Sequence, residues 1–348
     1  MNWMIYGANG YTGELIAREA KTRGLTPVLA GRNSGKIAPL AQELGFEQRV
    51  FSLDSPEEMA RHLQGIGLVL HCAGPFMSTS PPVIDACLRA KAHYLDITGE
   101  IGVFEHAQTK SGEAQAAGVV VCPGVGFDVV PTDCVAAALK AALPDADHLA
   151  LGFEADSVLS AGTAKTTVEG LPQGGKVRRA GKIVDVPHGY RVRRIDFGNG
   201  EKLCMTIPWG DVSTAYYTTG IANIEVFTPS SRLLIFGARQ VHHLRWLLGW
   251  APMQNMLKGM AAKSKGPTAE QRASQSTYVW GEVTNARGEK KTARLRTANG
   301  YAITVTGALG IVDYLLRHHP SGGTYTPAKL MGADFVTKLP GSSALIID

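Results

Sequence analysis

The feature that most constrains this chain is a glycine-rich segment directly after its first apolar run. Residues 3–6 suit a short buried strand, and residues 14–23 have the apolar spacing of a helix. Between them, the first glycine permits a tight turn, the second lets the backbone approach phosphate, and the third allows close helix–strand packing. A strand before the motif and a helix after it make the motif informative. We therefore predict a dinucleotide-binding loop made of Gly7, Ala8, Asn9, Gly10, Tyr11, Thr12 and Gly13.

Strand and helix patterns alternate six times over residues 1–125, which predicts a parallel, doubly wound sheet. Beyond this region, residues 176–228 and 277–297 read as short strands separated by turns, as in an antiparallel sheet. We predict an α/β fold: an N-terminal Rossmann doubly wound parallel sheet with an inserted α+β substrate or dimerisation domain. The expected first domain is 1–125 joined by the C-terminal segment 326–348, and the expected second domain is 126–325.

Composition narrows the classes of function. Residues 1–125 carry a net charge of −2 and residues 126–348 a net charge of +7, which indicates an acidic substrate or partner for the second half. No aromatic stacking surface or known reader motif accompanies the charge, which argues against nucleic acid. The five cysteines show no C-x-x-C spacing, so we expect neither a disulfide framework nor a metal site, and a cytoplasmic location. The N-terminus reads as a strand, without the basic start of a signal peptide.

The end of the second expected strand favours NADP(H) over NAD(H). An NAD-specific site places Asp or Glu there, about 20 residues beyond the loop, to hold the ribose 2′-hydroxyl. This chain instead has Ala30-Gly31-Arg32-Asn33. A guanidinium can donate charge-assisted hydrogen bonds to a 2′-phosphate and stack on adenine. The alternative is that Arg32 is a solvated loop charge. We predict NADP(H) as the cofactor, with Arg32 and Asn33 in its site.

Other residues at strand ends complete the expected cofactor site. Asp54 follows the third expected strand and could accept a hydrogen bond from the adenine amino group, although a helix-capping or turn role is equally compatible. The small residues after the fourth strand would let the cofactor pass close to the backbone, with an aromatic ring near the nicotinamide. These residues are Ala73, Gly74, Pro75 and Phe76.

Reduction by a nicotinamide cofactor also needs a group that donates or relays a proton. Asp128 is the first candidate because it begins the second expected domain, and its alternative role is a turn or N-cap. Glu100, after the Gly99 turn, is the second candidate, with a structural salt bridge as its alternative. Substrate is expected at Gly162, Thr163 and Lys165, where backbone, hydroxyl and ammonium donors would hold a carboxylate or phosphate.

Two further segments have open interpretations. Residues 232–262 are apolar but broken by charges and Pro252, and no uncharged run reaches about 18 residues, so no transmembrane helix is expected. The segment suits helices in a core or dimer interface, a wall for a long acyl chain, or a peripheral membrane contact. Basic residues gather at 176–202 and 287–296, either as solvated hairpin faces or as a dock for an acidic carrier protein.

The chain resembles the saccharopine dehydrogenase-like reductases, and more closely the branch that includes the trans-acting enoyl reductases. The resemblance rests on residues 7–13, 73–76, 94–100 and 126–133. It implies a homodimeric, NADP-dependent oxidoreductase that reduces an enoyl or carbonyl group of an acyl or polyketide-type substrate, either as a small molecule or on a carrier. An opine-type reductase of amino-acid-derived imines is one alternative, although Phe76 stands where those relatives have Tyr. A catalytically silent NADP-binding sensor or scaffold is the other.

Overall fold

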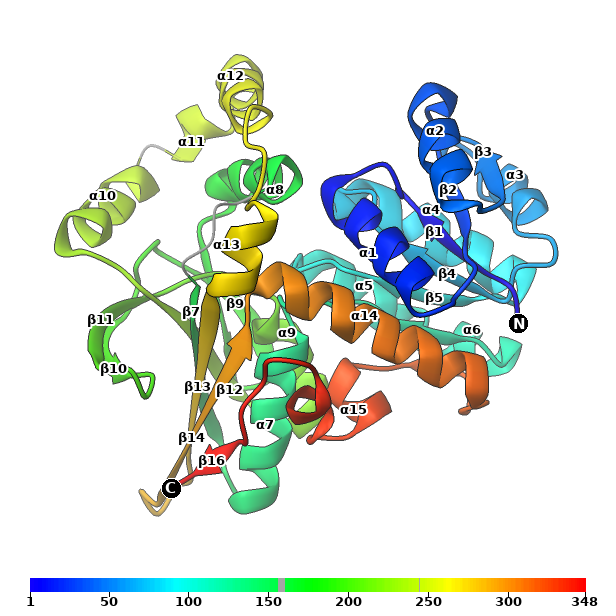
Figure 1. Cartoon of the computed structure of the whole chain (residues 1–348). Coiled ribbons are helices and arrows are strands. Elements are labelled where there is room, and N and C mark those ends of the chain that lie inside the picture. The colour runs from blue at the N-terminus through cyan, green and yellow to red at the C-terminus, as the bar shows by residue number, and fades with distance from the viewer. Residues whose placement is uncertain (156–159, 244) are drawn as a thin grey trace. The chain divides into compact units, whose positions relative to one another are not determined.

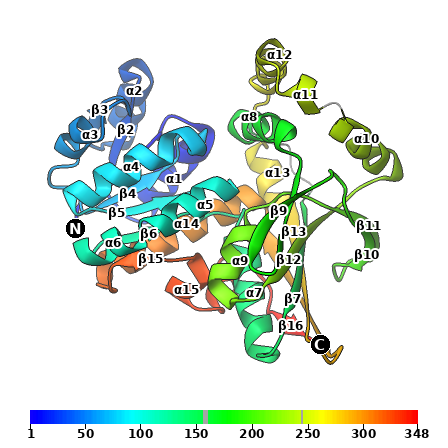
Figure 2. The same ribbon diagram turned by 180° about the vertical axis from the view of Figure 1, so that it is seen from behind.

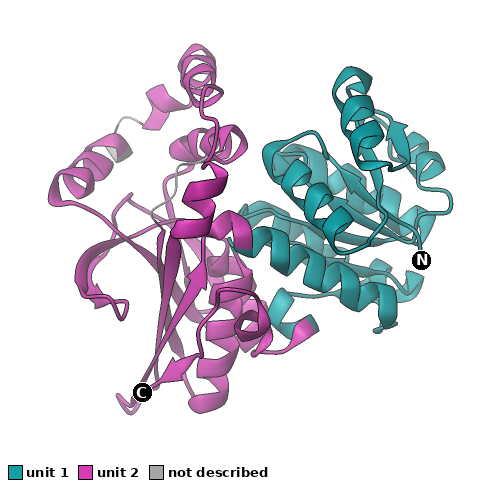
Figure 3. Cartoon of the chain, viewed as in Figure 1, with its two compact units in different colours: residues 1–128, 303–330 teal, residues 129–302, 331–348 magenta. Residues whose placement is uncertain are grey.

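The computed structural model describes residues 1–155, 160–243 and 245–348. The chain forms two compact units (Figure 3). Unit 1 consists of residues 1–128 and 303–330, and unit 2 consists of residues 129–302 and 331–348. The predicted fold class, a Rossmann-like parallel sheet plus a second mixed α/β unit, is confirmed.

Unit 1 contains a seven-stranded sheet in the order β15-β6-β5-β4-β1-β2-β3, and every pair in it is parallel. Strands of such a sheet are buried on both faces and therefore read as continuous apolar runs. The strands are β1 (Trp3–Tyr6), β2 (Val28–Gly31), β3 (Gln48–Val50), β4 (Leu68–His71), β5 (His93–Asp96), β6 (Val120–Cys122) and β15 (Gly323–Thr324).

Helices cover both faces of this sheet (Figures 1 and 2). Residues 101–117 form two consecutive helices, with the break at Lys110. The helices are α1 (Tyr11–Thr22), α2 (Ser34–Leu44), α3 (Pro56–His62), α4 (Phe76–Ala90), α5 (Ile101–Thr109), α6 (Ser111–Ala117), α14 (Gly300–Arg317) and α15 (Pro327–Met331).

The segment that returns to unit 1 differs from the expected 326–348. It is residues 303–330, which contain most of α14 together with β15, because β15 extends the parallel sheet beside β6. Residues 331–348 join unit 2, where β16 (Ile346–Ile347) pairs with β14 (Lys290–Ala298). Strand pairing thus decides to which unit each of the two C-terminal segments belongs.

Unit 2 is built on a nine-stranded sheet whose main path runs β10-β11-β12-β7-β13-β14-β16. Only the β12–β7 pair is parallel, and the hairpin β8–β9 joins the sheet through β12. The strands not yet bounded are β7 (His148–Ala155), β8 (Gly175–Arg179), β9 (Lys182–Val186), β10 (Val192–Asp196), β11 (Glu201–Thr206), β12 (Asn223–Pro229) and β13 (Ser276–Thr284).

The core of unit 2 lies between this sheet and α7 (Val130–Ala142). Gly281 of β13 allows the close approach, because a Cβ there would lie 2.7 Å from side-chain atoms of both Val135 and Leu139. Helix α9 (Asp211–Thr219) packs beside α7, although the sequence predicted only strands over residues 176–228. Its buried Val212, Ala215 and Thr219 follow a helical spacing that the Thr- and Tyr-rich composition obscures.

The remaining helices of unit 2 are α8 (Ala161–Gly170), the 3-10 turn η1 (Leu171–Gln173), α10 (Arg232–His243), α11 (Arg245–Leu248), α12 (Ala251–Ala261), α13 (Ala269–Ser274) and the 3-10 turn η2 (Phe335–Lys338). Among the described residues, none of the helices combines the length and the apolar character needed to cross a bilayer.

Candidate functional site

The glycine loop joins β1 to α1 and has the geometry that the sequence predicted. Gly7 has φ +84°, and a Cβ there would lie 2.8 Å from the Ala73 backbone nitrogen, so both conformation and space require glycine. A Cβ at Gly13 would overlap the Gly7 carbonyl oxygen. Gly10 caps α1, and a Cβ there would meet only the Gly7 carbonyl oxygen, at 3.3 Å. The loop therefore fits a pyrophosphate held at the start of a helix.

The ends of β1, β2 and β3 bring Arg32 and Asp54 to the same place. Tyr6, the last residue of β1, donates its hydroxyl to the Phe51 carbonyl at 2.9 Å. Burial raises the pKa of Tyr6 to about 12, while nearby Arg32 lowers it and nearby Asp54 raises it. Arg32 and Asp54 are both exposed, so both are available to a ligand.

The residues that follow Arg32 and Asp54 in the sequence, Asn33 and Ser55, lie at helix starts. Asn33 is exposed and directly precedes α2, whose first residue is Ser34. The cap of α3 is Ser55, which accepts a hydrogen bond from the Glu58 backbone N–H at 3.3 Å. Asp54 is therefore not the capping residue of that helix, which removes one alternative to a ligand-binding role.

Glu100 fixes the end of the loop after β4 through hydrogen bonds to its backbone. Its two carboxylate oxygens accept the backbone N–H groups of Phe76 and Met77, each at 2.9 Å, at the start of α4. A carboxylate is favoured there by the helix dipole. The predicted proton donor Glu100 is thus engaged in fixing the residues 73–76. The Phe76 ring is buried and packs edge-on against His71 at 5.3 Å, which does not favour the expected contact with nicotinamide.

His71 also supports this loop. Its Nε2 lies 2.9 Å from the Thr79 hydroxyl, which donates to the carbonyls of Ala73 and Pro75. Since that hydroxyl gives its proton to a carbonyl, the imidazole Nε2–H is the donor in the first contact. Burial lowers the pKa of His71 to about 3, so the ring is neutral.

Asp128 lies against the turn that precedes Glu100. A Cβ at Gly99 would be 2.6 Å from the Asp128 carboxylate, so the glycine makes room for this side chain. Burial and the negative charge of Glu100 raise the pKa of Asp128 to about 7. A carboxyl that titrates near neutral pH can both hold and release a proton. Asp128 is therefore the better placed of the two candidates for proton transfer.

Asp96, at the end of β5, is a site residue that the sequence did not single out. It is fully buried, and its Oδ1 accepts the backbone N–H groups of Thr98 at 3.0 Å and Gly124 at 2.8 Å. The Tyr94 hydroxyl donates to its Oδ2 at 2.6 Å. Burial raises the pKa of Asp96 to about 6 against the effect of these bonds. The available signal was a carboxylate inside an apolar strand that leads into a Thr-Gly turn.

The expected substrate-binding residues lie on α8 in unit 2. Ser160 caps this helix, accepting from the Thr163 backbone N–H at 3.4 Å, and its own N–H donates to the Tyr301 hydroxyl at 2.6 Å. Gly162 and Lys165 are exposed. Thr163 therefore has a structural role at the helix start, and Lys165 is the residue of this group that could reach a ligand.

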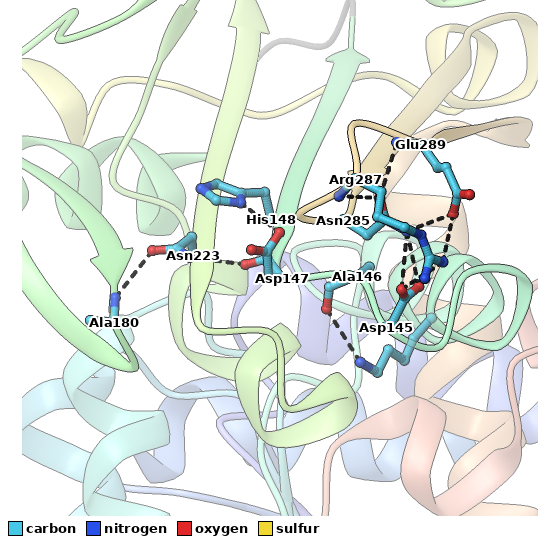
Figure 4. Close-up of polar contacts among 10 residues, drawn as sticks. Asp145, Ala146, Asp147, His148, Ala180, Asn223, Asn285, Arg287 and Glu289 are labelled. Carbon is cyan, nitrogen blue, oxygen red and sulfur yellow. Dashed lines mark hydrogen bonds and ion pairs between the residues drawn. The ribbon is translucent and has the colours of Figure 1, made fainter.

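Most basic side chains of residues 176–202, and Arg287 and Arg294 of residues 287–296, pair with neighbouring acids. Lys176 pairs with Asp185, and Lys202 with Glu154. Arg193 forms a two-pronged pair with Glu282, at 3.1 and 3.2 Å. In the second segment, Arg287 pairs with Asp145 and Glu289, both at 2.9 Å, and Asn285 joins the same network (Figure 4). These pairs favour solvated hairpin faces over a dock for an acidic carrier. In the described part of the chain, no group of three or more His, Cys, Asp or Glu is placed to hold a metal ion.

The N-terminal part of the chain matches a known protein family. Residues 3–122 match the family model described as the saccharopine dehydrogenase NADP binding domain. This match confirms the resemblance and the cofactor that the sequence predicted. The roles of Arg32 and of the other individual residues stay predictions.

Curated relatives match the same part of the chain. A probable mitochondrial saccharopine dehydrogenase-like oxidoreductase of Arabidopsis thaliana is 31% identical over 150 residues, covering 37% of this chain and 32% of that protein. The human saccharopine dehydrogenase-like oxidoreductase is 29% identical over 153 residues, covering 37% and 35%. A trans-acting enoyl reductase of Mycobacterium leprae is 30% identical over 141 residues, covering 37% and 33%. The matches thus span about a third of the length of these relatives.

Solved structures extend the likeness in fold to the whole chain. Saccharopine dehydrogenase (L-Glu forming) of Saccharomyces cerevisiae matches with a TM-score of 0.66 and 10% identity, covering 100% of this chain and 99% of that one. The homospermidine synthase of Legionella pneumophila, solved with NAD, also gives 0.66 and 10%, covering 100% and 91%. At this identity the likeness shows the fold alone.

Proposed function

We propose that this protein is an NADP-dependent oxidoreductase that reduces an enoyl or carbonyl group of an acyl or polyketide-type substrate. The observation that carries the proposal is the NADP-binding domain with Asp128, whose pKa of about 7 suits proton donation. The matched stretch of the mycobacterial trans-acting enoyl reductase supports an enoyl substrate. The ion-paired basic segments give no support to a carrier dock, so a free acyl thioester is the first substrate to test.

Different residues of the proposed site bind the cofactor, transfer the proton and fix the surrounding loops. The backbone of residues 7–13 and the start of α1 hold the pyrophosphate, and Arg32 holds the 2′-phosphate. NADPH, when bound, supplies hydride to the electrophilic carbon of the substrate. Asp128 then donates a proton from its carboxyl group to the adjacent carbon or to oxygen, and regains it from solvent. Glu100 and Asp96 fix the loops that carry these groups.

Cofactor binding is tested with the variant Arg32→Ala. Loss of a charged hydrogen bond weakens NADPH binding by about 1.5–3 kcal/mol and leaves NADH binding nearly unchanged. Arg23→Ala, which removes an arginine paired with Glu19 at the far end of α1, is the matched control and leaves both affinities unchanged. Equal weakening of NADPH and NADH by Arg32→Ala would contradict the assigned role.

The reaction is tested by NADPH oxidation with a trans-2-enoyl thioester, a ketone of similar chain length, and an α-keto acid mixed with an amino acid. Turnover of the enoyl or carbonyl substrate supports the proposal. Turnover of the imine mixture alone would identify an opine-type reductase. NADPH binding without oxidation in any mixture would identify a sensor. The homodimer implied by the resemblance is checked by sedimentation.

A further inference from the structure

Helices α10, α11 and α12 carry an unusual density of exposed apolar side chains. Leu233 is 80% exposed, Phe236 62%, Trp246 73% and Trp250 58%. Across the described ranges, no Trp or Phe outside residues 232–261 has a comparable exposure. Met256 and Met260 of α12 are also exposed, at 54% and 63%. Figures 1 and 2 show the three helices following one another along one edge of unit 2. We call them the α10–α12 surface.

The opposite side of these helices is attached to the rest of unit 2. In α10, Ile235 is buried and the Arg239 guanidinium donates to the Gly189 carbonyl at 3.2 Å. In α12, Gln254 donates to the Val168 carbonyl at 3.1 Å, and Lys258 pairs with Glu169 of α8 at 2.7 Å.

The attached and the exposed residues of α10 and α12 follow the three-to-four-residue repeat of a helix. Residues i and i+4 share a face, so 235 and 239 define the attached face of α10, and 254 and 258 that of α12. Leu233, and likewise Met256 and Met260, then fall on the outward face, and the exposed Phe236 lies at its side. The apolar side chains are thus held outward by a fixed inner face.

The charged side chains of the chain segment that contains the α10–α12 surface are all basic. Between Glu225 and Glu270 the sequence contains six Lys or Arg and no Asp or Glu. Lys258 is paired with Glu169, but Arg232, Arg245, Lys263 and Lys265 are exposed and have no ion pair among the residues that the structure describes. This differs from residues 176–202, whose basic side chains mostly have acidic partners.

From these observations we propose that the α10–α12 surface binds the face of an anionic phospholipid bilayer. Trp, Phe and Leu on the outward face with unpaired Lys and Arg are the composition of helices that lie in the membrane interface. Basic side chains near an anionic leaflet add electrostatic attraction. A second copy of this chain is a poorer occupant, because a two-fold contact would set each unpaired positive charge against the same set. The proposal goes beyond the proposed reaction and does not depend on which bond is reduced.

The test uses the whole chain and two kinds of vesicle, one of phosphatidylglycerol and phosphatidylcholine in equal amounts and one of phosphatidylcholine alone. The expected result is sedimentation with the anionic vesicles, a blue shift of tryptophan emission, and at least tenfold weaker binding to phosphatidylcholine or in high salt. The double variant Trp246→Ser/Trp250→Ser is expected to bind at least tenfold more weakly. The triple variant Arg232→Gln/Lys263→Gln/Lys265→Gln is expected to lose the preference for anionic vesicles.

The matched control is Ile346→Ser, which removes a 60% exposed apolar side chain from β16, outside the surface. It is expected to bind vesicles like the wild type. Circular dichroism and urea denaturation of the whole chain verify that every variant is folded, since NADPH binding would report on unit 1 alone. Absence of vesicle binding by the wild type, or equal binding by all variants, overturns the proposal. So does a wild-type dimer that the tryptophan variant abolishes without any vesicle binding, because the occupant is then a second copy.

Discussion

Two carboxyl side chains that lie close together in unit 1, Glu100 and Asp128, have different environments. Glu100 accepts two backbone N–H groups at the start of α4, and its charge is stabilised there. Asp128 is half-buried beside that charge, and its pKa rises to about 7. This difference in environment supports the proposal that Glu100 stays a fixed anion while Asp128 carries the proton.

The first prediction follows from the raised pKa of Asp128. The protonated form is the donor, so the wild-type kcat/KM is highest below pH about 7 and falls about tenfold per pH unit above it. Asp128→Asn lowers kcat/KM by roughly 10²–10⁴-fold and removes this dependence. The measurement is the pH profile of NADPH oxidation. Asp313→Asn, which breaks a surface pair with Arg317, is the control and keeps the wild-type profile. A wild-type profile in Asp128→Asn would exclude Asp128 as the donor.

A second prediction concerns stability in acid. The folded chain holds His71 neutral with a pKa of about 3, whereas in the unfolded chain its pKa is near 6.5. The unfolded state therefore binds more protons below pH about 6.5, and this residue costs the wild type up to about 1.4 kcal/mol of unfolding free energy per pH unit. Urea denaturation of the wild type and of His71→Gln between pH 7 and 4 measures the difference. Replacement of the exposed His148 by Gln is the control, and an equal effect in both variants would refute the role of His71.

At the scale of elements, the start of α4 depends on Glu100. Glu100→Ala leaves the N–H groups of Phe76 and Met77 without their acceptor and removes the favourable charge. We expect a loss of about 1–2 kcal/mol of unfolding free energy, and a smaller loss for Glu100→Gln, which keeps an acceptor. Glu113→Ala on α6, paired only with Lys110 at the surface, should change stability by less than about 0.5 kcal/mol. Urea denaturation that ranks these variants otherwise would contradict the capping role.

Elements with a simple apolar period could be predicted from the sequence, whereas two others could not. Strands β1, β2 and β4 of unit 1 are buried, mostly apolar runs, and the glycine loop is fixed by local sterics. Helix α9 was predicted as strand, and no element was predicted for α14. Both are rich in Thr, Val, Tyr or Ile, whose local preference is for strands, and their helical form comes from packing in the folded chain.

The candidate site likewise contains residues that the sequence predicts and residues that it does not. The loop residues, and the position of Arg32 at the end of β2, follow from a motif and its spacing along the chain. The roles of Asp96 and Glu100 do not, because each carboxylate bonds to loops that follow other strands, and only the folded sheet brings those loops together. The exposure of the apolar side chains of 232–262 was likewise undecided, since a helical pattern is the same for a covered face and an open one.

At the scale of the whole molecule, unit 1 is assembled from two distant stretches of chain. Residues 303–330 supply most of α14 and the edge strand β15. Thr304 accepts the Phe127 backbone N–H at 3.0 Å, and a Cβ at Gly126 would lie 2.9 Å from its methyl group. The N-terminal stretch alone therefore lacks part of its own core.

The last prediction tests this assembly. Residues 1–128 alone should not fold cooperatively, because α14 brings Leu309, Ile311, Val312 and Leu315, all fully buried, at roughly 1.5–3 kcal/mol each. Their sum is comparable with the 5–15 kcal/mol that stabilises a typical domain. The same residues joined through a Gly/Ser linker to 303–330 should unfold cooperatively and bind NADPH. Thermal denaturation with and without NADPH measures both properties. As a control, a linked chain with Leu309→Asp and Val312→Asp should behave like 1–128 alone. Cooperative unfolding of 1–128 by itself would show that the returning segment is dispensable.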